Sequence, residues 1–142
     1  MNATIRWTKA MQFSGAGAAG TTITMDARPE HGGVGAGPSP TETVLLALGG
    51  CTGMDVVSVL KKMRAPLEGL DMRITAERAE ERPRVFTRIA LEYTFVGAGL
   101  RPDQVERAVE LSQTRYCSVS AMLKQVAPLT YTWRIVRALE AG

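Results

Sequence analysis

Side chains that bind metals through nitrogen or sulfur are rare in this chain of 142 residues. It has two cysteines, Cys51 and Cys117, and a single histidine, His31. This inventory excludes a zinc site of four cysteines, or of two cysteines and two histidines, within one chain. It also excludes a disulfide-dense secreted scaffold. We therefore expect neither a bound metal nor a cofactor, and the two cysteines become the main candidates for chemistry.

A strong excess of one charge is also missing. The 17 Lys and Arg residues against 14 Asp and Glu residues leave a net charge of +3. The basic residues are scattered, and only Lys61, Lys62 and Arg64 cluster, at an expected helix end where cations suit the helix dipole. We therefore expect no nucleic-acid partner.

Long uninterrupted apolar runs are absent as well. The longest apolar stretch, residues 44–60, is broken by three glycines and by polar residues such as Asp55, so we expect no membrane partner. The start of the chain lacks a basic segment followed by an apolar core, which argues against a signal peptide. A cytoplasmic location, where thiols are normally reduced, is the resulting expectation.

The length and a hydrophobic content of 45% predict one folded domain over residues 1–142. Alternating apolar residues predict one strand from Ile5 to Phe13, and a second follows at 21–25 after a Gly/Ala-rich turn. The glycines and prolines of residues 26–38 indicate a loop. The Gly-rich part, residues 32–37, lacks the lysine of a phosphate-binding loop, so a plain loop or hinge is favoured.

Three signals mark the start of a long helix from Pro40 to about Arg64. Ser39 suits the N-cap, Pro40 suits the first helical position, and Glu42 completes a capping box. The helix is apolar nearly all round, as in a helix buried at the centre of a fold. Its interior glycines at 49, 50 and 53 are unfavourable, which predicts that another backbone passes close to them beside Cys51.

The second half of the chain predicts two strands, two helices and a last strand. The strands cover residues 70–77 and 85–95, and the first helix runs over 102–116 with one buried face. That face consists of Val105, Ala108, Val109, Ser112 and Tyr116. A short helix over 118–126 and a strand over 131–135 follow. The order β-β-α-β-β-α-α-β predicts an α+β domain with a mainly antiparallel sheet around a buried central helix.

The two cysteines have different surroundings in the sequence. Cys117 lies near the start of a short helix, where the thiolate is favoured, whereas burial in the central helix should raise the pKa of Cys51. Two inert core cysteines and a redox-active pair both fit this pattern. Asp55, one turn after Cys51, is either its base or hydrogen-bond partner, or a satisfied buried or interface carboxylate. His31 is either a solvated loop residue or an active-site donor.

Two motifs add a family resemblance. Residues 40–52, Pro-Thr-Glu-Thr-Val-Leu-Leu-Ala-Leu-Gly-Gly-Cys-Thr, strongly resemble the central helix of the OsmC/Ohr family of osmotically inducible and organic-hydroperoxide-resistance proteins. Residues 116–120, Tyr-Cys-Ser-Val-Ser, resemble its second cysteine element, with Ser118 in place of a proline. The resemblance implies an OsmC-like fold and an intertwined homodimer with two sites at the subunit interface. It implies that Cys51 attacks an organic hydroperoxide, that Cys117 resolves the sulfenic acid as a disulfide, and that a dithiol reductant restores the pair.

The sequence departs from the family pattern at two places. Thr41 stands where the family has its catalytic glutamate, with Glu42 one residue later. The first hairpin turn has no arginine, and His31 occupies the other position where the family places one, with Arg28 nearby. The central Gly-Gly-Cys-Thr-Gly-Met-Asp is closer to an OsmC-like subgroup. Glu42, Asp55, Arg28 and His31 are therefore the candidates that support the cysteines.

Three functions follow from these features. The first is a thiol-dependent peroxidase for organic hydroperoxides. The second is a non-catalytic module on the same fold that binds a small apolar molecule or senses oxidation. The third is thiol exchange with protein disulfides.

Overall fold

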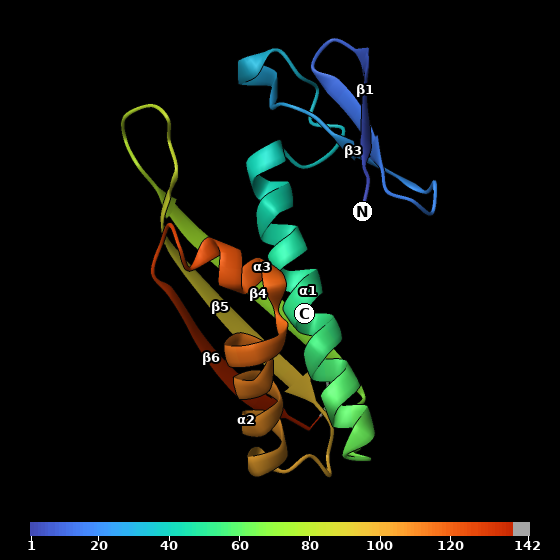
Figure 1. Ribbon diagram of the computed structural model, residues 1–142, viewed down its shortest axis with the longest axis vertical. Coiled ribbons are helices and arrows are strands. Elements are labelled where there is room, and N and C mark those ends of the chain that lie inside the picture. Colours follow the sequence, from blue (N-terminus) through green and yellow to red (C-terminus); the bar gives the residue numbers. More distant parts are fainter. Residues whose placement is uncertain (138–142) are drawn as a thin grey trace. The chain divides into compact units, whose positions relative to one another are not determined.

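The computed structural model describes residues 1–137 and has two compact units, one over Met1–Leu46 and one that begins at Ala47 (Figure 1). The first unit holds a three-stranded sheet, here called sheet A, and the second holds another, sheet B. Helix α1 (Pro40–Lys62) begins in the first unit and ends in the second. The mixed α+β composition is confirmed, whereas a single domain over residues 1–142 stays a prediction.

Sheet A consists of three antiparallel strands in the order β1 (Thr4–Lys9), β2 (Gln12–Ala16) and β3 (Thr22–Met25). The prediction of one strand from Ile5 to Phe13 was wrong, because the chain reverses at Ala10, which has a φ of 47°. Trp7 Nε1 donates to the Ala10 carbonyl at 2.8 Å and stabilises the reversal. No glycine, proline, asparagine or aspartate marks this turn, and the alternation of apolar residues continues across it, so the sequence pattern gave no sign that the chain reverses there.

The loop of residues 26–38 is organised around a buried carboxylate. Asp26 accepts hydrogen bonds from the backbone N–H groups of Ala27 at 2.7 Å, Val34 at 3.1 Å and Ala36 at 3.0 Å. These hydrogen bonds, that from Ala36 foremost, lower the pKa of Asp26. A Cβ at Gly33 would lie 1.8 Å from the Ala27 carbonyl oxygen, so only glycine fits there. The loop's N–H groups thus bind a carboxylate of the chain itself, in line with the plain-loop interpretation.

Helix α1 begins with the predicted capping box. The Glu42 N–H donates to Ser39 Oγ at 3.2 Å, and the Ser39 N–H donates to Glu42 Oε1 at 3.1 Å. Only one face of the helix is buried, formed by every fourth residue: Leu48, Thr52, Val56 and Leu60. The expectation of burial all round was therefore wrong for this chain, since Leu46 is 57% and Met54 is 76% exposed.

Among the described residues, α1 is the one helix that is long and apolar enough to cross a membrane, judged by length and composition alone. The polar interruptions in residues 44–60 had led us to expect no such helix. The core helix of a soluble protein satisfies the same criterion. Contacts with sheet B, described below, place part of α1 in a protein core.

Sheet B consists of β4 (Gly69–Arg78), β5 (Phe86–Val96) and β6 (Leu129–Val136). β4 and β5 are antiparallel, whereas β6 runs parallel to β5, so the sheet is mixed. The helices of the second unit cover one of its faces (Figure 1). The core under them contains the inward residues of β5: Ile89, Leu91, Tyr93 and Phe95.

The predicted close approach to the helix glycines occurs at one position only. A Cβ at Gly49 would lie 2.7 Å from Ile74 Cδ1 on β4, whereas Gly50 has open space around it. The neighbour is a side chain, not the backbone that we expected. Gly49 therefore lets α1 pack closely against sheet B.

The crossover from β5 to β6 contains α2 (Pro102–Leu111), a π-helical turn η2 (Ser112–Tyr116) and α3 (Ser118–Leu123). The predicted buried face is confirmed from Val105 to Ser112, but Tyr116 is 53% exposed. The wider π turn rotates the chain after Ser112, so an α-helical spacing no longer applies to Tyr116. Such turns are common at functional sites, and Cys117 follows directly.

Candidate active site

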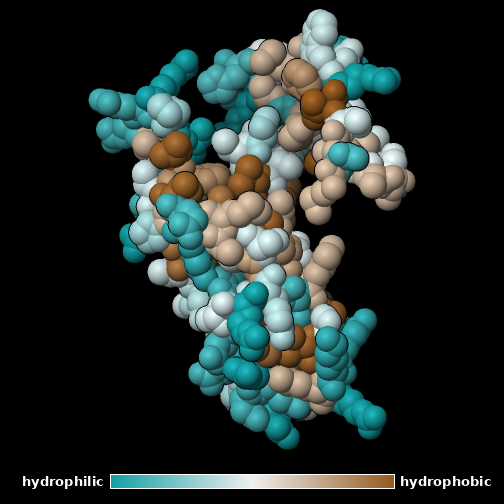
Figure 2. Space-filling view, viewed as in Figure 1, coloured by the Kyte–Doolittle hydropathy of each residue, from teal (hydrophilic) through white to brown (hydrophobic). Residues whose placement is uncertain are grey.

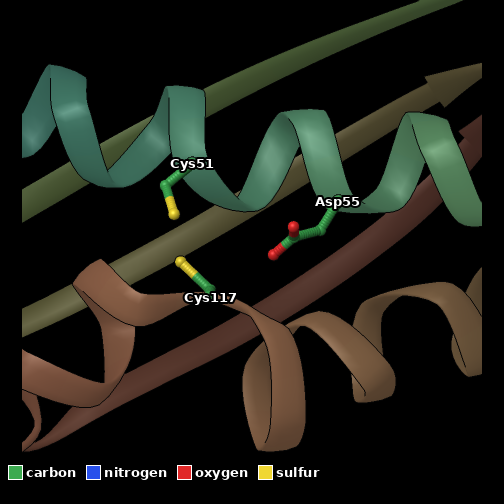
Figure 3. A group of neighbouring side chains, drawn as sticks. All are labelled: Cys51, Asp55 and Cys117. Atoms are coloured by element: carbon green, nitrogen blue, oxygen red, sulfur yellow. The ribbon is translucent and has the colours of Figure 1, made fainter.

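Three side chains of the second unit meet between α1 and the start of α3. Cys51 and Asp55 project from successive turns of α1, and Cys117 caps α3 (Figure 3). Their two sulfur atoms and one carboxylate oxygen all lie within 4.8 Å of one another. Both cysteines are free thiols, and Figure 3 shows their sulfur atoms pointing toward each other. The two motif cysteines, 66 positions apart in the sequence, thus form one site.

Cys51 ionises more readily than an ordinary cysteine. Burial opposes its ionisation and is the largest single influence, but hydrogen bonds from the Val119 N–H, Cys117 and Ser118 together outweigh it and lower the pKa of Cys51. Ser118 Oγ lies 3.9 Å from the sulfur. The nearby Asp55 charge acts in the opposite direction. Ser118, the residue that departs from the family motif, therefore supplies a hydroxyl to this thiol.

Cys117 is held as a thiol. Burial raises its pKa, and the hydrogen bonds it receives from Ser120 offset this only in part. Its sulfur is the N-cap acceptor of α3, 3.4 Å from the Ser120 nitrogen. The expectation that the helix start activates Cys117 and leaves Cys51 without help was wrong. The Val119 N–H, in the first turn of α3, serves Cys51 instead.

Asp55 ends a buried chain of hydrogen bonds. Its Oδ2 accepts from Ser112 Oγ at 2.9 Å, and Ser112 Oγ lies 2.6 Å from Thr52 Oγ1. Thr52 Oγ1 in turn lies 2.6 Å from the Tyr93 hydroxyl, and Gln113 Nε2 reaches both Tyr93 at 2.9 Å and Thr52 at 3.2 Å.

Counting donors fixes the direction of this chain. A carboxylate only accepts hydrogen bonds, so the Ser112 hydroxyl donates its one proton to Asp55 and must accept a hydrogen bond from Thr52. Thr52 must then accept from Tyr93, which must accept from the Gln113 amide. Burial raises the pKa of Tyr93, which keeps its hydroxyl a donor. Every proton points toward Asp55, so the chain orients and stabilises that carboxylate beside the thiols.

Four members of this chain were not predicted as site residues: Thr52, Tyr93, Ser112 and Gln113. A signal was available for two of them. Thr52 follows Cys51 directly, and Ser112 is the one polar residue in an otherwise apolar predicted face. Tyr93 lies in the strand predicted over residues 85–95, where its hydroxyl gave no further indication of a role.

The other three supporting candidates belong to the first unit. Glu42 forms the capping box, and the hydrogen bonds from Ser39 lower its pKa. Arg28 precedes the short 3₁₀ turn Pro29–His31, which contains the exposed His31. Of the four supporting candidates, Asp55 is the one that lies in the same unit as the two cysteines. Catalytic roles for all of these residues stay predictions.

Comparison with known proteins agrees with this architecture. The family of OsmC-like proteins matches residues 31–132. Protein YhfA of Escherichia coli (strain K12) is 41% identical over 138 residues, which cover 97% of this chain and 100% of the relative.

Solved structures of other proteins share this fold. A hypothetical protein from Aquifex aeolicus VF5 superposes with a TM-score of 0.84 at 28% identity, over 97% of each chain. An organic hydroperoxide resistance protein OsmC from Legionella pneumophila shares the fold, with a TM-score of 0.67 at 16% identity over 93% of this chain and 94% of that one. The matched family, the relative aligned over its whole length and the shared fold agree: this chain belongs to the OsmC family.

Proposed function

We propose that the protein is a thiol-dependent peroxidase that reduces organic hydroperoxides, with Cys51 as the attacking and Cys117 as the resolving residue. The observation that carries the proposal is the pairing of two facing thiols with opposite pKa shifts, Cys51 lowered and Cys117 raised. An attacking thiolate must be ionised, whereas a resolving thiol serves best as a proton donor first. Family membership supports the same chemistry, since family members are named for organic hydroperoxide resistance.

The proposed reaction balances with these two residues. The Cys51 thiolate attacks the terminal peroxide oxygen; the S–O bond forms, the O–O bond breaks, and an alkoxide leaves. Cys117 gives its proton to the alkoxide, which departs as the alcohol, and becomes a thiolate. That thiolate attacks the sulfenic sulfur of Cys51; the S–S bond forms, and hydroxide leaves as water with the proton that Cys51 had released. A dithiol then reduces the disulfide by exchange.

The geometry requires a small movement for the second step. The sulfur atoms lie within 4.8 Å, whereas a disulfide bond is about 2.05 Å long. Cys117 lies between a π turn and a six-residue helix, so a local shift of this segment suffices.

The proposal includes a homodimer in the cytoplasm, where a dithiol reductant is available. One face of sheet A supports the dimer, because apolar side chains cluster there: Ile5, Trp7, Phe13 and Ile23. Trp7 is 64% and Ile5 58% exposed, and Figure 2 shows apolar atoms at the surface of this part of the molecule. Apolar clusters of this kind commonly mark protein interfaces.

The test is rapid mixing of the reduced protein with cumene hydroperoxide and, separately, with hydrogen peroxide, followed by peroxide consumption and loss of free thiols. The wild type should consume one equivalent of cumene hydroperoxide per chain without reductant, lose two thiols, and turn over when a dithiol is added. Cys51→Ser should reduce consumption to the background rate, because no attacking sulfur remains.

Cys117→Ser is the matched control. It should consume one equivalent and stop at the sulfenic acid, which a dimedone adduct detects by mass spectrometry. Equal consumption by Cys51→Ser and the wild type would disprove the proposal.

The non-catalytic alternative has one observation in its favour. The first unit contains a mainly apolar hollow of about 410 Å³, lined by residues that include Ile5, Ile23 and Met25. A small apolar ligand could occupy it without any thiol chemistry. If the wild type consumes no peroxide but binds an apolar fluorescent probe that Ile23→Asp displaces, this alternative replaces the peroxidase.

A further inference from the structure

The three groups that meet at the candidate site, two thiols and a carboxylate, are all of kinds that bind Zn²⁺, a cation of borderline softness. Thiolate sulfur and carboxylate oxygen bind Zn²⁺ at about 2.3 Å and 2.0–2.2 Å, which places neighbouring ligand atoms about 3.3–3.8 Å apart in a tetrahedron. The sulfurs of Cys51 and Cys117 and an oxygen of Asp55 already lie within 4.8 Å of one another. Shifts on the order of 1 Å therefore complete three corners of a zinc site.

The charges at the site favour a cation over an anion. Within residues 1–137, neither of the two salt bridges involves Asp55, so no basic side chain neutralises it. The side chain that lies 3.9 Å from the Cys51 sulfur, the hydroxyl of Ser118, is neutral as well. With both thiols ionised, the three ligands would carry three negative charges, which a divalent cation reduces to one.

The surroundings of Asp55 match those of a metal ligand. One carboxylate oxygen accepts from Ser112 at 2.9 Å, and among the described residues the other accepts no hydrogen bond. Metal-binding carboxylates are characteristically oriented by such a hydrogen bond. The buried chain through Thr52 and Tyr93 fixes Ser112 in turn.

We infer that Cys51, Asp55 and Cys117 form a binding site for Zn²⁺, with a fourth position open to water or a ligand. Two thiol protons are released when the metal binds, and no electron is transferred. The absence of a metal site was expected from cysteines and histidines alone, and a carboxylate from the neighbouring helical turn supplies the missing ligand. Zinc at this site would occupy both thiols and stop peroxide reduction, so the inference goes beyond the proposed function.

The test uses the reduced full-length protein, freed of metal, titrated with Co²⁺ and then with Zn²⁺. We expect thiolate-to-cobalt charge-transfer bands and tetrahedral visible bands that saturate at one Co²⁺ per chain and disappear when one Zn²⁺ is added. Two protons per Zn²⁺ should be released into a weak buffer. Cys51→Ser and Cys117→Ser should each lose most of the charge-transfer intensity.

The decisive comparison is between two aspartates. Asp55→Asn should weaken Zn²⁺ binding about 10–100-fold, and Ser112→Ala about 10-fold through the lost orienting hydrogen bond. Asp71→Asn, an exposed residue of β4, is the matched control and should bind like the wild type. Circular dichroism of each variant checks that it is folded.

Two results would overturn the inference: no charge-transfer band at one equivalent of Co²⁺, or equal affinities of Asp55→Asn and Asp71→Asn for Zn²⁺. Peroxide consumption is measured separately on the metal-free protein. A protein that binds zinc but consumes no peroxide refutes the proposed function alone, and a metal-free peroxidase without cobalt bands refutes the zinc site alone.

Discussion

Each of the two units contains an aspartate that is at least partly buried, and the two carboxylates differ in the number and kind of hydrogen bonds that they accept. Asp26 is 2% exposed and accepts three backbone N–H groups of its own loop. Asp55 accepts one serine hydroxyl, and the N–H and O–H donors around it serve the sulfur of Cys51 instead. A carboxylate whose lone pairs are filled by backbone donors holds a loop in place, whereas a partly filled one beside two thiols remains available for chemistry.

The largest expected effect is on stability. Asp26→Asn replaces one accepting oxygen by an NH₂ group that faces backbone donors, so it should lower the unfolding temperature strongly. Asp55→Asn should lower the unfolding temperature only slightly, because the single hydroxyl that donates to Asp55, that of Ser112, can still donate to the amide oxygen of asparagine. Thermal unfolding followed by circular dichroism measures both, and equal losses in the two variants would contradict the assigned difference.

The pH dependence sharpens the same prediction. Because hydrogen bonds lower the pKa of Asp26 in the folded state, its contribution to stability is complete above the unfolded value of about 3.9. It is lost as the pH falls from there through the lower folded pKa. The wild type should therefore lose stability on acidification below about pH 4 more steeply than Asp26→Asn does.

A smaller loss of stability is expected when the buried hydrogen-bond chain that leads to Asp55 is interrupted at Thr52. Thr52→Val removes the acceptor of the Tyr93 hydroxyl and the donor to Ser112 at a fully buried position. The free energy of unfolding should fall by about 1–3 kcal/mol. Thr43→Val is the control in the same helix; its hydroxyl only donates to the Ser39 carbonyl, which also accepts the Thr43 N–H. Urea denaturation should show a clearly smaller loss for Thr43→Val.

The smallest effect concerns the two thiols. Since the pKa of Cys51 is lowered and that of Cys117 is raised, Cys51 should be alkylated by iodoacetamide at a lower pH than Cys117. Ser118→Ala should shift the pH profile of Cys51 alkylation slightly toward higher pH. Ser58→Ala, which changes an exposed serine two turns after Cys51 on α1, should leave that profile unchanged. Peptide mass spectrometry distinguishes the two sites. Identical profiles for both thiols would remove the distinction between an attacking and a resolving cysteine.

Local signals made much of this fold predictable from the sequence. Ser39, Pro40 and Glu42 determine the start of α1 through their own contacts, and the period-two pattern of β5 follows from its burial on one face. Ala10 shows the limit, because its turn depends on a hydrogen bond from Trp7 and not on a typical turn residue.

The candidate site was predictable in its cysteines but not in their chemistry. The spacing of Cys51 and Asp55 places both on one side of a helix. Which thiol receives the Val119 N–H depends on how the crossover packs on α1, and no local pattern encodes that packing. The π turn before Cys117 likewise became visible only in the structure.

Cys117 lies in the crossover between β5 and its parallel neighbour β6, whereas Cys51 lies in α1, before either strand. A disulfide between them would close a loop of about 65 residues, which in the chain-entropy model stabilises the folded state by about 4 kcal/mol. Oxidation would thus tie the crossover that precedes β6 to helix α1. In that model, a chain oxidised by peroxide would be unfolded for a smaller fraction of the time than the reduced chain, and would expose fewer of its bonds to proteases.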